Sequence, residues 1–81
     1  MKSEIELLEQ SIFCEKNYLM NLLKRLVYIR ADYSLKSNYE KNEVEIITYE
    51  TKKLIVKKNK QIIQLEQKLK MALIKSMLVA L

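Results

Sequence analysis

The sequence predicts an all-α fold, an antiparallel hairpin of two long amphipathic helices with coiled-coil-like packing. Three observations lead to this prediction. The 81 residues include no Gly and no Pro, the usual residues of tight β-turns and linkers. Apolar residues recur every three or four positions in both halves of the chain, and this recurrence stops between residues 30 and 46. We therefore expect one domain, residues 1–81, with a helix over 3–33, a turn over 34–38 and a helix over 38–80.

The first helix is predicted from a heptad pattern that begins at Ile5. Steps of three and four residues give nine positions, of which only Glu15 is not apolar: Ile5, Leu8, Ile12, Glu15, Leu19, Leu22, Leu26, Ile29 and Tyr33. Glu15 is expected either at an edge of the helix interface or paired with a cation on the neighbouring helix. Four further residues widen the apolar stripe to about half of the helix circumference, namely Phe13, Met20, Leu23 and Val27. A stripe of this width favours two neighbouring helices.

The turn is predicted where the heptad phase is lost. Ser37 and Glu40 have the spacing of a capping box, in which each side chain accepts a hydrogen bond from the other residue's backbone N–H. Asn38 tolerates the left-handed conformation that ends a helix without Gly. Each half of the chain also begins with acidic residues and ends with basic ones, as the dipoles of two separate helices favour. The alternative is a single long helix of about 120 Å in a coiled coil.

Charges of the two halves become complementary in an antiparallel hairpin. Near the turn, we expect Arg25 and Arg30 to lie close to Glu43 and Glu50. At the far end, we expect acids of the first helix to lie close to lysines of the second: Glu4 and Glu9 with Lys68, Lys70 and Lys75. Exposed pairs of this kind contribute a few tenths of a kcal/mol each, so their main effect is on orientation.

The second helix is predicted from a separate apolar phase with a period close to 3.6 residues: Val44, Ile47, Thr51, Leu54, Ile55, Lys58, Ile62, Leu65, Leu69, Leu73, Met77 and Ala80. A further stripe on its other side contains Tyr49, Val56, Ile63, Met71, Ile74 and Leu78. Because the second helix is longer than the first, its last residues, 71–81, are expected to extend beyond the hairpin partner. That segment is too short to span a bilayer, which requires about 20 residues.

The predicted function is protein binding, because a hairpin cannot cover all of these apolar surfaces by itself. The candidate protein-binding residues are Phe13, Met20, Val27, Tyr49, Val56, Ile63, Met71, Ile74, Leu78 and Leu81. Two arrangements fit. The chain is either a homodimer that closes into a four-helix bundle, or a subunit, small chaperone or adaptor that covers another protein's amphipathic helix. The predicted plan resembles small hairpin co-chaperones of bacterial secretion systems and short helical subunits of eukaryotic multi-protein assemblies, a resemblance of architecture alone.

A run of lysines supports an alternative function. Residues 51–60 contain five Lys, and the formal net charge of the chain is +5. Five lysines along the second helix are candidate ligands for nucleic acid or another anion: Lys53, Lys57, Lys60, Lys68 and Lys75. The alternative is therefore a dimeric helical regulator that binds nucleic acid. A simpler interpretation is that this stripe is a solvated outer face, since it contains no Arg for base readout.

Several classes of function are disfavoured by composition. The chain has no His and one Cys, so we expect no metal site, no internal disulfide and no Cys–His nucleophile. No Gly-rich loop is present to hold a phosphate, and two helices provide no enclosed pocket. We therefore expect no catalytic residues, no cofactor and no enzymatic activity. The N-terminal sequence MKSEIELLEQ does not resemble a signal peptide, and a single Cys suits a reducing compartment, so a cytoplasmic location is expected.

Overall fold

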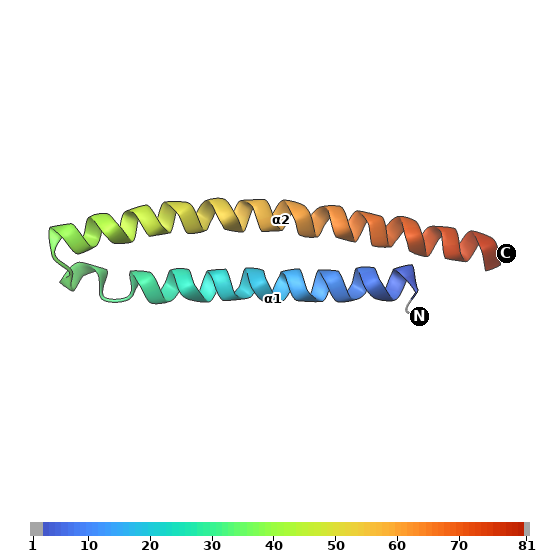
Figure 1. Ribbon diagram of the computed structural model, residues 1–81, viewed down its shortest axis with the longest axis horizontal. Coiled ribbons are helices and arrows are strands. Elements are labelled where there is room, and N and C mark those ends of the chain that lie inside the picture. The colour runs from blue at the N-terminus through green and yellow to red at the C-terminus, as the bar shows by residue number, and fades with distance from the viewer. Residues whose placement is uncertain (1–2, 81) are drawn as a thin grey trace.

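The computed structural model describes residues 3–80. It contains a helix α1 (Glu4–Arg30), a short 3-10 helix η1 (Tyr33–Leu35) and a helix α2 (Asn38–Ala80). The two long helices run antiparallel and side by side (Figure 1). The molecule measures 65 × 18 × 17 Å, and its long axis corresponds to the length of α2 at about 1.5 Å per residue. The predicted hairpin is therefore confirmed, and the alternative of a single rod is excluded.

The start of α1 is fixed by its cap. Ser3 adopts an extended backbone conformation, and its Oγ accepts a hydrogen bond from the Glu6 N–H at 3.2 Å. This bond satisfies one of the N–H groups that have no partner within a helix. Glu4 and Glu6 in the first turn and Arg30 in the last turn complement the helix dipole. The helix ends at Arg30, earlier than the predicted residue 33.

The chain reverses direction through Asp32, which has a φ of 57° and a ψ of 25°. Asp is one of the few residues that tolerate this left-handed conformation, because its short polar side chain can form local hydrogen bonds. The prediction had assigned this role to Asn38, which instead is the first residue of α2. The sequence therefore identified the segment in which the chain turns but not the residue whose backbone makes the turn.

Ser37 caps α2, although by a variant of the predicted capping box. Its Oγ accepts from the Glu40 N–H at 3.2 Å, as expected. The Glu40 carboxylate, however, accepts from the Ser37 hydroxyl at 2.9 Å rather than from the Ser37 backbone N–H. Next to this cap, Tyr33 lies beneath two cations, with the Arg30 Cζ at 5.0 Å and the Lys41 Nζ at 5.6 Å from its ring centre. Partial burial and the neighbouring Glu45 carboxylate raise the pKa of the Tyr33 phenol.

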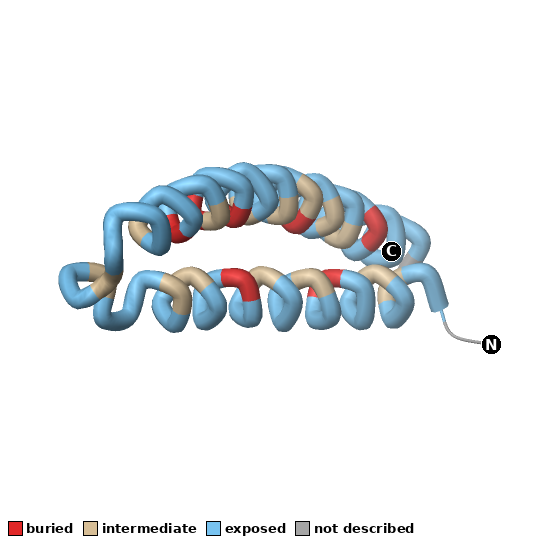
Figure 2. Tube along the Cα trace, turned by 60° about the vertical axis from the view of Figure 1, so that its left-hand side comes forward, coloured by how far each residue is buried: buried red, intermediate tan, exposed pale blue. Residues whose placement is uncertain are grey.

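The face of α1 that packs against α2 contains eight residues of the predicted heptad, from Ile5 to Ile29, and the ninth, Tyr33, lies in η1; all nine are buried or half-buried. The side chains elsewhere on α1 are exposed, and Figure 2 shows the buried positions of both helices turned toward each other. A two-helix packing buries little, and only five apolar side chains of the described residues are buried: Ile12, Leu22, Val44, Ile62 and Ala72.

The packed face of α2 follows a stricter repeat than predicted. Nine of its buried and half-buried residues recur at steps of four and three: Val44, Thr48, Thr51, Ile55, Lys58, Ile62, Leu65, Leu69 and Ala72. Lys41, Ile47 and Gln61 are also half-buried and lie outside this series. Leu54, Leu73 and Met77 were predicted on this face but are exposed. Thr51 was predicted there and keeps only 4% of its surface accessible, and Thr48, which was not predicted there, is equally buried. The reason is that a packed helix pair repeats every 3.5 residues, so a stripe with a period of 3.6 turns gradually away from the partner.

Candidate protein-binding surface

The exposed surface of the hairpin is unusually apolar. Within the described residues, twenty large apolar or aromatic side chains keep 40% or more of their area exposed. All nine predicted protein-binding residues within the described part of the chain belong to this group, whereas Leu81 lies outside the described residues. Scattered exposed apolar residues are normal in soluble proteins, but contiguous rows of them indicate a binding surface. The arrangement of these residues in rows is therefore the important observation.

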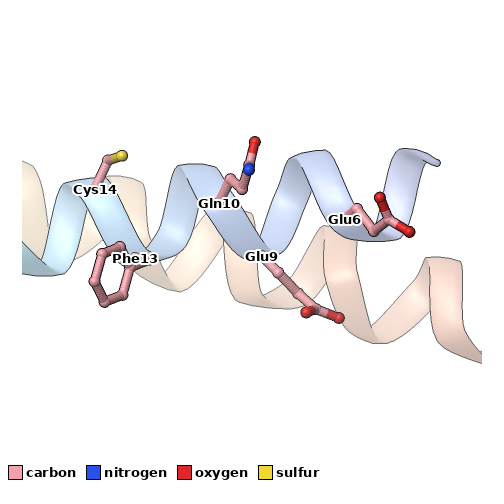
Figure 3. A pocket seen from close by; sticks show the side chains of 5 residues that line it. All are labelled: Glu6, Glu9, Gln10, Phe13 and Cys14. Atoms are coloured by element: carbon pink, nitrogen blue, oxygen red, sulfur yellow. The ribbon is translucent and has the colours of Figure 1, made fainter. Parts of the chain in front are cut away.

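One row runs along α1 through Phe13, Met20 and Val27, at intervals of seven residues. Because the helix packs with a seven-residue repeat, all three side chains lie on the same side of α1. Figure 3 shows the start of this row, with Phe13 and Glu9 pointing to one side of α1 and Cys14 and Gln10 to the other. Together with Glu6, these four residues border a shallow, open depression.

A second row runs along α2 through Tyr49, Val56 and Ile63, again at intervals of seven residues. Continuing at the same interval gives Lys70 and then Met77. Sequence reasoning missed Met77 as a member of this row, although the seven-residue spacing would have identified it. At the other end of the row, the Lys53 Nζ lies 4.7 Å from the centre of the Tyr49 ring. Cation–π contacts at exposed sites contribute about 0.5–1 kcal/mol, so this contact is a weak one.

The Arg30–Glu45 ion pair shows that both rows lie on the same flank of the hairpin. Arg30 Nη1 lies 3.1 Å from Glu45 Oε1, across the gap between the helices. Val27 precedes Arg30 by three residues and Tyr49 follows Glu45 by four, so each lies next to its end of the ion pair on one helix face. We name the surface formed by Phe13, Met20 and Val27 of α1 with Tyr49, Val56 and Ile63 of α2 the shared flank.

The same ion pair corrects the charge pairing expected near the turn. Arg30 pairs with Glu45, and it also donates to Thr48 Oγ1 at 3.2 Å, rather than pairing with Glu43 or Glu50. This second bond satisfies the hydroxyl of a buried Thr. At the far end of the hairpin, the structure agrees better with the expected charge pairing, because Glu4 of α1 borders one surface hollow with Lys68 and Lys75 of α2.

Three residues predicted for the end of α2 do not continue the row of Tyr49, Val56 and Ile63. Met71, Ile74 and Leu78 were predicted in one stripe with Tyr49, Val56 and Ile63, but none of them falls in the seven-residue series. Met71 and Leu78 lie on another side of the helix, whereas Ile74 lies next to the row, three residues before Met77. Met71 borders the hollow that contains Glu4, on what we name the opposite flank. The segment of α2 that extends beyond α1 begins later than the predicted residue 71. Ala72 is still buried beside the start of α1, whereas residues 73–79 are all exposed.

The lysine stripe lies entirely on the surface. Lys53, Lys57, Lys60, Lys68 and Lys75 are all exposed. They do not form one compact patch, because Lys53 contacts Tyr49 near the turn while Lys68 and Lys75 lie beside Glu4 at the far end. Lysines on a solvated outer face would be spread along the helix in the same way.

The described residues contain no arrangement suited to binding a metal ion. No group of three or more His, Cys, Asp or Glu side chains within residues 3–80 is placed to hold one. Cys14 is an exposed free thiol. Within the same residues, neither helix has a stretch long and apolar enough to cross a membrane.

Comparison with known proteins gives no assignment. No protein-family model, curated protein or solved structure matches this chain.

Proposed function

We propose that this chain is a non-catalytic protein-interaction module, which acts by packing its exposed apolar flanks against amphipathic helices of another polypeptide chain. The observation that carries this proposal is the imbalance between covered and uncovered apolar surface. Five apolar side chains are buried between the helices, whereas twenty large ones remain at least 40% exposed in the described residues. Burial of apolar area contributes about 25 cal/mol per Å², so covering these rows would release substantial free energy.

The shape of the hairpin supports the same proposal. Two antiparallel helices present flat flanks on which further helices can pack in the manner of a four-helix bundle. The exposed residues recur every seven positions along each helix, which is the spacing that such packing uses. A partner of this kind is an amphipathic helix or helical hairpin, and the products are a homodimer or a complex in which the chain is a subunit, adaptor or small chaperone.

The proposal is tested by measuring association and its dependence on the flanks. Light scattering on the purified chain gives its mass in solution, to be compared with 9.7 kDa for one copy. In parallel, pull-down from a lysate compares the wild type with a variant that has Asp at four exposed positions, namely Leu7, Met20, Val56 and Met71. Assembly of the wild type, or specific capture of a protein, that is lost in this variant supports the proposal. A helical monomer whose interactions are identical in both forms overturns it.

A further inference from the structure

The two rows of the shared flank lie at matching heights along the hairpin. The register follows from two contacts between the helices, Glu15 with Lys58 at 2.7 Å and Arg30 with Glu45 at 3.1 Å. In this register the row members form three levels: Phe13 with Ile63, Met20 with Val56, and Val27 with Tyr49. Successive levels are separated by about 10.5 Å along the helix. The apolar side chains of the shared flank are therefore evenly spaced. The shared flank of a second copy of the chain has the same spacing.

The charges of the shared flank are balanced. Eight charged residues either continue the two rows or lie between the rows and the helix interface. Four are acidic, Glu6, Glu9, Glu45 and Glu66, and four are basic, Lys16, Arg30, Lys52 and Lys70. The chain as a whole carries a formal charge of +5. Lys24, Lys53 and Lys60 lie beyond the rows, toward the outer side. Two copies can therefore meet through this flank without the repulsion that the net charge would otherwise cause.

The area of the flank is close to that of a stable dimer interface. The hairpin has a solvent-accessible surface of 6761 Å². This is larger than the surface of about 5,100 Å² of a compact monomer of 9.7 kDa. When two hairpins stack, the contact extends over the length of α1, about 40 Å, and over the 18 Å width of the molecule. It therefore covers about 700 Å² on each copy. Stable interfaces bury about 800 Å² on each partner, so the flank approaches this size.

We infer that the partner is a second copy of this chain, and that two hairpins stack through the shared flank to form an antiparallel four-helix bundle. This inference rests on the function proposed above and specifies its partner and its surface. The opposite flank is less suited, because polar residues interrupt its apolar side chains at seven-residue intervals: Asn21 between Cys14 and Tyr28 on α1, and Glu43, Glu50, Lys57 and Gln64 before Met71 on α2.

The experiment compares two double variants with matched exposure. Met20→Asp with Val56→Asp changes the centre of the shared flank, where the side chains are 52% and 56% exposed. Leu7→Asp with Met71→Asp changes the opposite flank, where the exposed fractions are 52% and 55%. None of these residues belongs to the helix interface, so circular dichroism should show both variants to be helical. Light scattering and analytical ultracentrifugation then give the dimer dissociation constant of each.

We expect the wild type to be a dimer, the Met20/Val56 variant to dissociate at least ~100-fold more readily, and the Leu7/Met71 variant to remain a dimer. In a mixture of labelled and unlabelled wild-type chains, isotope-filtered NMR should also detect contacts between copies at the Met20 and Val56 methyl groups. A dimer that survives the Met20/Val56 change and is lost in the Leu7/Met71 variant overturns the inference but leaves the proposed function intact. A wild-type monomer at 100-micromolar concentration overturns the inference, and the proposed function then depends on capture of a different protein.

Discussion

Lys58 of α2 donates a hydrogen bond to Glu15 of α1, with 2.7 Å between Nζ and Oε2. Both side chains lie on the faces through which the helices pack, and they are only 24% and 30% exposed. Glu15 is the one non-apolar member of the predicted heptad, and of the two placements expected for it, the structure shows pairing with a cation of the neighbouring helix. The Lys58 Nζ also lies 4.8 Å from the centre of the Tyr18 ring, which holds the ammonium at this level of the hairpin.

The Glu15–Lys58 pair is expected to stabilise the hairpin in its observed register. Lys58→Met leaves a half-buried carboxylate without its partner and should lower the free energy of unfolding by ~1–2 kcal/mol. Exchange of the charges, Glu15→Lys with Lys58→Glu, should recover most of this loss. Urea unfolding followed by circular dichroism, at one fixed protein concentration, measures both effects. Lys57→Met, at the exposed neighbouring position, is the control and should change stability by less than ~0.5 kcal/mol.

Additive effects of the two single changes, Glu15→Lys and Lys58→Glu, would show that the two side chains do not interact.

Ser37 is expected to be important for the start of α2. Ser37→Ala removes the acceptor of the Glu40 N–H and the hydroxyl that donates to the Glu40 carboxylate. We expect a loss of ~1 kcal/mol in the free energy of unfolding. The control is Ser11→Ala in the middle of α1, where the side chain is exposed and the change should be neutral or slightly stabilising. Equal stability of the two variants would show that the cap contributes nothing.

The left-handed backbone of Asp32 predicts a specific order of stability among substitutions at this position. Gly and Asn tolerate a φ of 57°, so Asp32→Gly and Asp32→Asn should stay within ~0.5 kcal/mol of the wild type. A β-branched residue does not tolerate it, and Asp32→Val should destabilise the hairpin by at least ~1–2 kcal/mol. Thermal unfolding of the three variants gives the order. If the Val variant is as stable as the Gly variant, the turn does not require this conformation.

The lysine stripe is expected to be separable from association. Lys53→Glu, Lys57→Glu and Lys60→Glu together change exposed side chains outside the helix interface and beyond the rows of the shared flank. We therefore expect the triple variant to keep the solution mass and the helicity of the wild type. Binding of the wild type to heparin or DNA that falls steeply with salt, and that is lost in this variant, would instead support nucleic-acid binding. Electrophoretic mobility shift at two salt concentrations makes this comparison.

The sequence by itself determined that the chain forms two helices, where it reverses direction, and which residues of α1 pack against α2. These features depend on local properties: the apolar repeat from Ile5 to Tyr33, the loss of that repeat after it, and the cap at Ser37. Local patterns also located the candidate surface residues, because side chains outside a heptad face are exposed whatever the partner helix is.

Only the tertiary structure decided which face of α2 is buried. Its apolar residues follow a period near 3.6, so the sequence placed Leu54, Leu73 and Met77 in the interface, whereas packing against α1 imposes a repeat of 3.5 and buries Thr48 and Ala72 instead. The register set by Glu15 with Lys58, and the flank shared by the two helices, arise in the same way. They depend on how one helix lies against the other, which neither helix specifies alone.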